Sequence, residues 1–197
     1  MIAIIKYNAG NITSVEHAVK RLGLPCRVTD EIDEILCADK VIFPGVGEAK
    51  SAIKYLKDRE LDEVIKSLLQ PVLGICLGLQ LMCRHSEEGD TPCMDIFDAA
   101  VKKFPALDIV PHMGWNKVRQ TRSHPIWAGI PDDTHFYFVH SYYADPADPG
   151  LTVGETDYGV TFTCAVAAAN IFAVQFHPEK SAEHGLRLYR NFVDWQP

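Results

Sequence analysis

A cysteine flanked by glycines is the residue of this sequence best placed to act as a nucleophile. Cys76 lies in Gly74-Ile75-Cys76-Leu77-Gly78, between a segment that predicts a buried strand and one that predicts a helix. In such a nucleophile elbow, the glycines permit a sharp turn that raises the central side chain above the sheet edge. The N-terminal end of the helix lowers a thiol pKa and offers N–H groups to an oxyanion. The alternative is that Cys76 only fills space at a strand end.

A base for this nucleophile is found near the other end of the chain, in His177-Pro178-Glu179. Proline disfavours the helical conformation of its predecessor, so His177 is expected to be extended, with residues two apart on one side. The Glu179 carboxylate would then lie beside the imidazole and fix its tautomer and orientation. Alone, the cysteine motif is a moderate signal and the His-x-Glu motif a weak one, because buried cysteines and most histidines are commonly structural. Together they predict a Cys76–His177–Glu179 site for nucleophilic catalysis.

A loop containing glycines follows another apolar strand, at Pro44-Gly45-Val46-Gly47. It is not a dinucleotide-binding G-x-G-x-x-G loop, because Lys50 occupies the third glycine position. A simple turn is one interpretation. Beside a cysteine nucleophile, the N–H groups of such a loop would suit an oxyanion hole, and its glycines would allow a peptide to turn over.

The elements that must position these residues alternate between strand and helix in the first half of the chain. Short, continuously apolar strands followed by helices predict a parallel sheet covered on both faces, with Cys76 at the carboxyl ends of the strands. Asn11 is expected to cap the first helix. The strands are expected over 2–7, 26–29, 40–43 and 72–76, and the helices over 12–22, 49–57, 61–69 and 77–84.

The second half predicts further strands, several of them antiparallel, over 112–119, 134–143, 151–156, 161–168 and 171–176. The Ala169-Asn170 pair resembles a hairpin turn. A last helix follows Ser181, which is expected to cap it, with Glu183 in its first turn. Without a repeat or linker, the 197 residues are interpreted as a single α/β domain, with a mostly parallel central sheet, flanking helices and additional antiparallel strands.

Composition and charge disfavour several classes of function. Hydrophobic residues make up 47% of the chain, as in ordinary globular proteins, and the net charge is −7 without a Lys/Arg-rich run, so we expect neither nucleic-acid nor membrane partners. No apolar stretch suits a membrane span or a signal peptide, so a cytoplasmic location is expected. No C-x-x-C pair exists, so a zinc or thioredoxin-like motif has no support. Neither a metal nor a cofactor is expected. Most of the six cysteines should be inert and buried: Cys26, Cys37, Cys76, Cys83, Cys93 and Cys164.

The Gly-Ile-Cys-Leu-Gly-Leu-Gln run at Cys76 and the Gln-Phe-His-Pro-Glu run at His177 resemble the motifs of class I glutamine amidotransferases, and the resemblance spans essentially the whole chain. It implies the flavodoxin-like fold of that family. It also implies that the cysteine attacks the side-chain amide of glutamine, that a thioester forms and ammonia leaves, and that water then releases glutamate. By the same resemblance, the backbones of Val46 and Leu77 form the oxyanion hole. The implied substrate contacts are Gly47, Gln80, Glu88, His140, Ser141 and Tyr142.

Three further segments, 6–11, 111–116 and 138–143, resemble the glutaminase subunits of imidazole glycerol phosphate synthases; Pro-His-Met-Gly-Trp-Asn is the most specific. This implies a heterodimer with a cyclase of the HisF type, a (β/α)₈ barrel that uses the ammonia in histidine biosynthesis. The interface residues implied are Asn11, Met113, Trp115 and Lys180. Met113 and Trp115 could instead fill core. A glutaminase domain leaves no room here for a synthase domain, so a partner chain is expected.

Other interpretations stay open. The chain could serve a different synthase, for example as a duplicated copy in a sugar-modifying pathway, or act as a non-enzymatic scaffold of the same fold. A cysteine hydrolase of other amides or peptides is a third alternative. The sequence also leaves open whether the oxyanion loop is preformed, and we expect low basal activity that rises when the partner binds its ligand.

Overall fold

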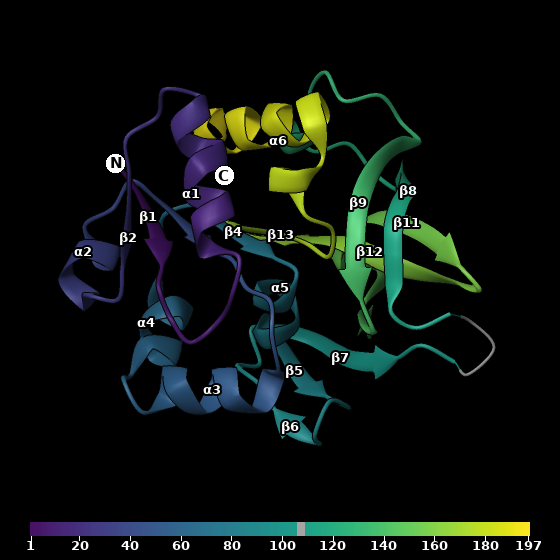
Figure 1. Ribbon diagram of the computed structural model, residues 1–197, viewed down its shortest axis with the longest axis horizontal. Coiled ribbons are helices and arrows are strands. Elements are labelled where there is room, and N and C mark those ends of the chain that lie inside the picture. The colour runs from purple at the N-terminus through teal and green to yellow at the C-terminus, as the bar shows by residue number, and fades with distance from the viewer. Residues whose placement is uncertain (106–108) are drawn as a thin grey trace.

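The computed structural model describes residues 1–105 and 109–197, and one sheet runs through it (Figure 1). Its first part is parallel, in the order β2-β1-β3-β4, as the alternating pattern predicted. Parallel neighbours require crossover connections, which the helices provide. The strands of this part are β1 (Ile2–Ile5), β2 (Cys26–Thr29), β3 (Lys40–Phe43) and β4 (Val72–Ile75).

Helices cover both faces of the parallel strands (Figure 1). One face carries α1 (Ile12–Arg21) and α6 (Ala182–Asp194), and the other carries α3 (Ala49–Lys57) and α4 (Leu61–Ser67). A short helix that was not predicted, α2 (Ile32–Leu36), lies near the β2 edge. Among the described residues, no helix has the length and apolar character needed to cross a membrane.

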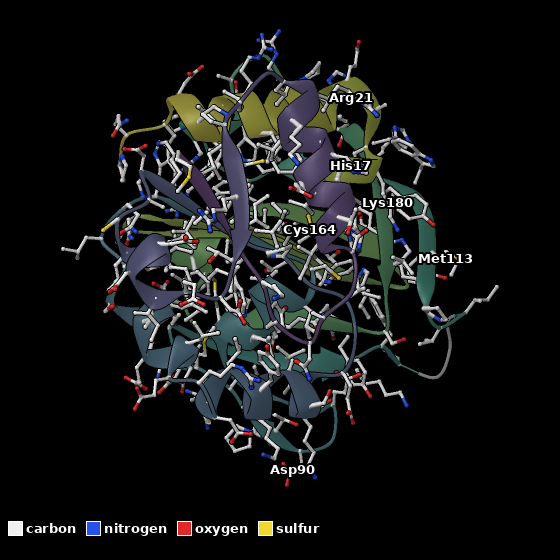
Figure 2. The ribbon with its side chains drawn as sticks, turned by 60° about the vertical axis from the view of Figure 1, so that its left-hand side comes forward. His17, Arg21, Asp90, Met113, Cys164 and Lys180 are labelled. Atoms are coloured by element: carbon white, nitrogen blue, oxygen red, sulfur yellow. The ribbon has the colours of Figure 1, made fainter. Side chains whose placement is uncertain are left out.

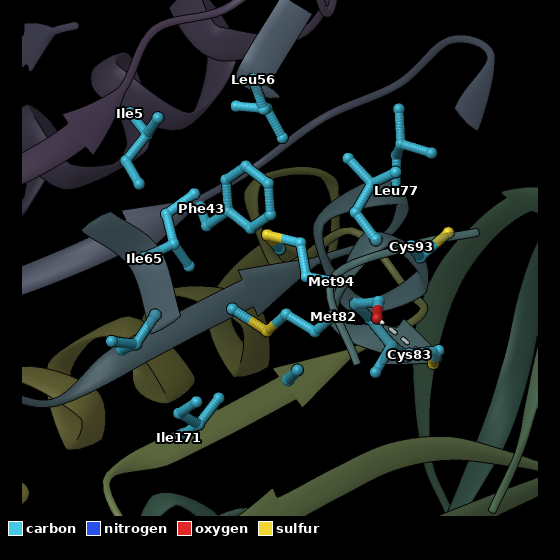
Figure 3. Packing of buried hydrophobic residues seen from close by; sticks show 14 of the residues in the cluster. Ile5, Phe43, Leu56, Ile65, Leu77, Met82, Cys83, Cys93, Met94 and Ile171 are labelled. Carbon is cyan, nitrogen blue, oxygen red and sulfur yellow. Dashed lines mark hydrogen bonds between the residues drawn. The ribbon is translucent and has the colours of Figure 1, made fainter. Parts of the chain in front are cut away.

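Each face of the parallel strands has its own hydrophobic core, because successive strand side chains point to opposite faces. Ile4 belongs to the core beneath α1 and α6, whereas Ile5 belongs to the core against α3 and α4. Figure 3 shows the latter core, in which Phe43 of β3, Leu56 of α3 and Met82 lie in one buried cluster. This burial anchors β3 and β4, the strands that carry the glycine loop and the cysteine.

The second part of the sheet is mainly antiparallel, as predicted, and β13 joins it to the first part. β13 pairs parallel with β4 and antiparallel with β12, and the β12–β13 hairpin turns at Ala169, whose φ is 48°. The fold class predicted from the sequence is therefore confirmed. The strands of this part are β8 (His112–Gln120), β9 (Thr134–His140), β10 (Tyr142–Pro146), β11 (Thr152–Tyr158), β12 (Val160–Ala168) and β13 (Ile171–Val174).

Two predictions about elements between residues 77 and 146 are wrong. The helix α5 (Leu77–Met82) ends before Cys83, and the chain continues into three strands that their polar residues concealed. The strand predicted over 134–143 is broken at Ser141, because β9 pairs with β8 whereas β10 pairs with β7 and β12. The concealed strands are β5 (Cys83–Ser86), β6 (Thr91–Pro92) and β7 (Phe97–Lys103).

Neither of the two predicted helix caps makes a capping hydrogen bond. Asn11 has a left-handed backbone, with φ 70°, and its side chain donates to Glu179 instead. The Ser181 hydroxyl donates to the His177 carbonyl at 2.6 Å and accepts from the Tyr137 N–H at 3.0 Å. Both side chains therefore hold the segment that carries His177.

Candidate active site

Cys76 occupies the turn between β4 and α5. Its backbone, with φ 53° and ψ −108°, is a conformation that costs a non-glycine residue about 1–3 kcal/mol. The turn is held at both ends, since the Cys76 N–H donates to the Val174 carbonyl at 2.7 Å and the Gln80 N–H donates to the Cys76 carbonyl at 3.2 Å. The residue is 5% exposed. Such strain persists only where the surrounding structure enforces it, and it is typical of active sites.

The flanking glycines are required by close packing. A Cβ at Gly78 would lie 1.9 Å from the Phe43 carbonyl oxygen, and one at Gly74 would lie 2.8 Å from the Ala173 Cβ. Positive φ occurs at Cys76 itself and at neither of these glycines. The glycines therefore let β3 and β13 approach the elbow, which differs from the conformational role expected from the sequence.

His177 follows β13 with its side chain fully buried, and its Nδ1 lies 2.7 Å from Glu179 Oε1. His177 is extended, but Glu179 belongs to a single 3₁₀ turn, η3 (Pro178–Lys180). The two side chains therefore meet through a tight turn, and not through the alternation of a strand. Asn11 Nδ2 donates to the same carboxylate oxygen, and the Tyr189 hydroxyl donates to the other at 3.4 Å. These contacts fix the carboxylate that orients the imidazole.

The surroundings of His177 favour its protonated form. Burial is the largest influence and lowers its pKa, but the nearby Cys76 sulfur and the Glu179 carboxylate outweigh burial and raise the pKa to about 10. The Nε2 atom is buried and makes no hydrogen bond of normal geometry within the described chain. Elsewhere burial raises the pKa of Cys93 to about 11 and that of Cys83 further, so these thiols stay protonated and unreactive.

A buried amide that was not among the predicted site residues contacts the Cys76 sulfur. Gln175 Nε2 donates to Cys76 Sγ at 3.6 Å, and Gln175 Oε1 accepts from Gln80 Nε2 at 3.0 Å. Gln80 Nε2 also donates to the Tyr142 carbonyl at 2.9 Å. Because Gln80 donates to Oε1, the NH₂ group of Gln175 must face the sulfur. The signal that could have found Gln175 is a polar residue on a buried strand, two positions before His177.

Two histidines extend this chain of hydrogen bonds away from Cys76. His140 Nδ1 lies 2.8 Å from the Tyr142 carbonyl, His112 Nδ1 lies 3.1 Å from His140 Nε2, and Asn116 Nδ2 lies 3.3 Å from His112 Nε2. A carbonyl only accepts, so both imidazoles carry their proton on Nδ1. Burial lowers the pKa of His140 to about 3 and that of His112 to about 4. Both rings are therefore neutral at neutral pH.

The glycine loop after β3 closes against the elbow. The Gly45 carbonyl accepts from the Leu77 N–H at 3.1 Å, and the Val46 carbonyl accepts from the Gly10 N–H at 2.9 Å. The C=O and N–H of a trans peptide point in opposite directions, so the Val46 N–H points away from Leu77. In this conformation the N–H groups of Val46 and Leu77 do not converge on one point.

A cavity of about 220 Å³ opens beside Cys76. The side chains of His177 and Glu179 are fully buried and do not line it. Pro111 and Val139 are the lining residues that were not predicted as site residues. The cavity is lined by Val46, Gly47, Cys76, Leu77, Gln80, Glu88, Pro111, Val139, His140, Ser141 and Tyr142.

Glu88 connects two walls of this cavity. It lies between β5 and β6, where its N–H donates to the Ser86 hydroxyl at 3.1 Å. Its Oε2 accepts from the Ala49 N–H at 2.8 Å, at the first residue of α3. The carboxylate therefore ties the end of the glycine loop to the β5–β6 turn, and it still borders the cavity.

The residues predicted for a partner interface lie in two environments. Met113 is 63% and Trp115 is 53% exposed on β8, so the alternative that they fill core is wrong. Met113 and Lys180 lie on the same side of the molecule (Figure 2), and Lys180 Nζ is 5.7 Å from the centre of the Tyr137 ring. Asn11 is only half-exposed and bonds to Glu179. Within residues 1–105 and 109–197, no group of three His, Cys, Asp or Glu side chains could hold a metal ion.

Comparisons with known proteins agree with this arrangement. Residues 3–195 match the family model described as glutamine amidotransferase class-I. The chain is 52% identical over 196 residues to "Imidazole glycerol phosphate synthase subunit HisH" of Bacteroides thetaiotaomicron, covering 98% of both chains. It is 46% identical over 209 residues to the HisH subunit of Aromatoleum aromaticum, covering 100% of this chain and 99% of the relative.

Solved structures share the fold at low sequence identity. A structure titled as a glutamine amidotransferase aligns with TM-score 0.75 and 18% identity, covering 98% of this chain and 97% of the other. A glutamine amidotransferase from Thermotoga maritima aligns with TM-score 0.67 and 18% identity, covering 98% and 82%. The family match and the HisH relatives show that this chain belongs to the class I glutamine amidotransferase family, and to its HisH branch.

Proposed function

We propose that this chain hydrolyses glutamine through a Cys76 thioester and passes the ammonia to a HisF-type (β/α)₈ cyclase with which it forms a heterodimer. The partner would make imidazole glycerol phosphate and the aminoimidazole carboxamide ribonucleotide of histidine biosynthesis. The observation that carries the proposal is a strained Cys76 on the cavity wall, beside a buried His177–Glu179 pair. The names of the HisH relatives support the choice of acceptor. A single domain and a cytoplasmic location, both expected from the sequence, are part of the same proposal.

In the proposed first step, the Cys76 thiolate attacks the side-chain amide carbon of glutamine. The carbonyl becomes an oxyanion, the C–N bond breaks, and the His177 imidazolium gives its proton to the departing nitrogen, which leaves as ammonia. Water then attacks the thioester while His177 takes a proton from it. The C–S bond breaks, glutamate leaves and the thiolate returns. Glu179 holds the imidazole for both transfers.

The oxyanion needs two N–H groups that this conformation does not offer together. We assign that role to Val46 and Leu77, after the Gly45–Val46 peptide has turned so that its carbonyl releases Leu77. Glycine on either side of Val46 lowers the barrier to such a turn. The chain alone should therefore be a slow glutaminase. Docking and ligand binding by the partner would favour the turned peptide.

The remaining cavity residues would hold the amino-acid end of glutamine. Glu88 supplies a carboxylate for the α-ammonium group, and Gln80 keeps its side-chain oxygen free because its NH₂ group is already engaged. Gly47 and the 140–142 segment would contribute mainly main-chain groups: His140, Ser141 and Tyr142. With the amino-acid end of glutamine held by these residues, its side-chain amide would lie at Cys76.

The proposed docking surface combines exposed apolar residues of β8 with a lysine beside the site. Met113 and Trp115 present apolar area to solvent, which is typical of interface residues. Lys180 directly follows Glu179, so a contact with the partner there would act close to the triad. Asn11 would border the same surface while its side chain stays bonded to Glu179 as it is here.

The test is a pull-down with the HisF-type barrel, followed by glutaminase assays with and without the ligand of the cyclase. We expect complex formation, slow glutamate release by the chain alone and a rise with the loaded partner. Cys76→Ser should abolish glutamate release and leave the complex intact. Residual glutaminase activity in that variant would contradict the thioester. Equal rates with and without the loaded barrel would contradict activation, and stimulation by another synthase would favour a different acceptor.

A further inference from the structure

The Tyr7 side chain carries a buried polar group that the proposed mechanism has not used. Tyr7 follows β1, is 5% exposed, and packs its ring 5.3 Å from the ring of Phe43. Its hydroxyl is buried and has no hydrogen-bond partner among residues 1–105 and 109–197. A phenylalanine would fill the same space without leaving a buried hydroxyl unpaired, so the hydroxyl calls for an explanation.

This hydroxyl lies directly against the oxyanion loop. A Cβ built on Gly45 would be 1.9 Å from the Tyr7 hydroxyl oxygen, so only the absence of a side chain at Gly45 lets the two residues touch. Gly45 is the residue whose carbonyl occupies the Leu77 N–H. Burial and the nearby Cys76 raise the pKa of Tyr7 well above its usual range, which keeps its proton available for donation.

We propose that the Tyr7 hydroxyl is the hydrogen-bond donor that receives the Gly45 carbonyl when the Gly45–Val46 peptide turns away from Leu77. The inference rests on the proposed glutaminase function. In the closed loop the carbonyl is paired and the hydroxyl is not. In the turned loop the carbonyl must leave the Leu77 N–H, and a bond to Tyr7 replaces the one it loses. Tyr7 is thus a positioning residue, which acts on the reaction through the loop.

A hydroxyl with this role has an unusual signature when it is removed. Tyr7→Phe takes away one oxygen atom that has no partner in the closed loop, so the closed loop should be as stable as before or more so. The turned loop loses its donor and becomes less populated. The loss of one neutral hydrogen bond changes the ratio of turned to closed loop on the order of tenfold. Activity and stability should therefore move in opposite directions.

The experiment compares wild type, Tyr7→Phe and Tyr55→Phe as full-length chains. Tyr55 lies on α3 with its ring under the Arg59 guanidinium, 3.7 Å away, and serves as a matched control outside the cavity. Glutamate release is measured for the chain alone and with the HisF-type barrel loaded with imidazole glycerol phosphate. Iodoacetamide alkylation of Cys76, which needs no oxyanion hole, and the thermal unfolding midpoint are measured in parallel.

For Tyr7→Phe we expect basal kcat to fall on the order of tenfold, with KM unchanged and a smaller loss in the loaded complex, where the loop is already turned. Alkylation of Cys76 should be unaffected, and the unfolding midpoint should be equal or higher. Unchanged basal kcat would overturn the inference. Equal losses with and without the loaded barrel would place the hydroxyl on the reaction itself. Slower alkylation or a lower midpoint would show a structural role. If wild type releases no glutamate under either condition, the proposed function itself fails.

Discussion

The two sides of Cys76 are built in opposite ways. On the side of the base, His177, Glu179 and Gln175 are buried and joined by hydrogen bonds that fix their orientation. On the side of the loop, the Gly45 carbonyl occupies the Leu77 N–H, and the nearby Tyr7 hydroxyl has no hydrogen-bond partner in the part of the chain that the structure describes. Under the proposed mechanism, the first side is already arranged for reaction and the second is not.

This difference indicates on which side of Cys76 the activity of the proposed site could be regulated. Rearranging the base side would break several buried hydrogen bonds at once, and each unpaired buried group is costly. Turning the Gly45–Val46 peptide exchanges few hydrogen bonds, and the glycines on either side of Val46 tolerate the change in backbone conformation. A conformational switch that costs little free energy is therefore expected on the loop side. Changes on the base side should be large and independent of the partner.

The largest effect is expected from removing the charge of Glu179 on the base side. Glu179→Gln keeps the size of the side chain but removes the negative charge that helps to raise the pKa of His177 to about 10. We expect kcat/KM to fall ~10²–10⁴-fold, as when the carboxylate of a catalytic triad is neutralised. The pKa of His177 falls, so the alkaline limb of the pH–rate profile moves to lower pH.

The same loss should appear with and without the loaded barrel, because the base side does not depend on the loop. Glu183→Gln, an exposed carboxylate of α6 with 88% of its side chain accessible, is the control and should change neither rate nor profile. If Glu179→Gln lowered kcat/KM only in the absence of the loaded barrel, the base side would depend on the partner, and the contrast between the two sides would be wrong.

Much of the base side could be predicted from the sequence, because its signals are local. A strand followed by Gly-x-Cys-x-Gly and another followed by His-Pro-Glu place their side chains at the same sheet edge once the strands are parallel neighbours. What escaped prediction was contributed from elsewhere in the chain. Asn11 was expected to cap α1 but bonds to Glu179, and Gln175 meets Cys76 only because β13 pairs with β4.

The loop side could be predicted only in part. The glycines of 44–47 mark a loop that can turn, but they do not say which way the Gly45 carbonyl points. That choice depends on the Leu77 N–H and on the contact with Tyr7, both set by packing across distant segments. Strands β5 to β7 also escaped prediction, since their charged residues mask the alternation of a half-buried sheet.

A smaller effect, on stability, is expected from His140 and His112, the two neutral histidines that continue the hydrogen bonds from Gln80 and Tyr142. Burial lowers the pKa of His140 to about 3 and that of His112 to about 4, whereas unfolding restores ordinary values near 6.5. From pH 6.5 down to 4 the unfolded chain binds protons that the folded chain excludes, so the free energy of unfolding falls with pH. We expect these two histidines to contribute a loss of about 2–4 kcal/mol between pH 7 and pH 5; His124, whose pKa burial also lowers to about 4, adds to the total loss in every variant compared.

Urea unfolding at several pH values measures this loss. In His112→Phe one of the two titrating rings is absent, and the new ring should stack between Phe138 and Tyr158 as the imidazole does, at 4.9 and 3.9 Å. The variant should lose less stability than wild type between pH 7 and pH 5. If the variant loses as much stability as wild type, His112 is not a buried neutral histidine in the folded chain.

The smallest effect is expected at Gln175, whose side-chain amide donates to the Cys76 sulfur. Gln175→Met keeps the length of the side chain but removes the N–H that donates to Cys76 Sγ at 3.6 Å. A thiolate that loses a hydrogen-bond donor is less stable, so alkylation of Cys76 by iodoacetamide at neutral pH should slow about tenfold. Because Gln175 lies on the base side, this slowing should be the same with and without the loaded barrel. If alkylation is unchanged, the amide serves only to hold Gln80. If the slowing disappears in the loaded complex, Gln175 responds to the loop, and the two sides of Cys76 are coupled.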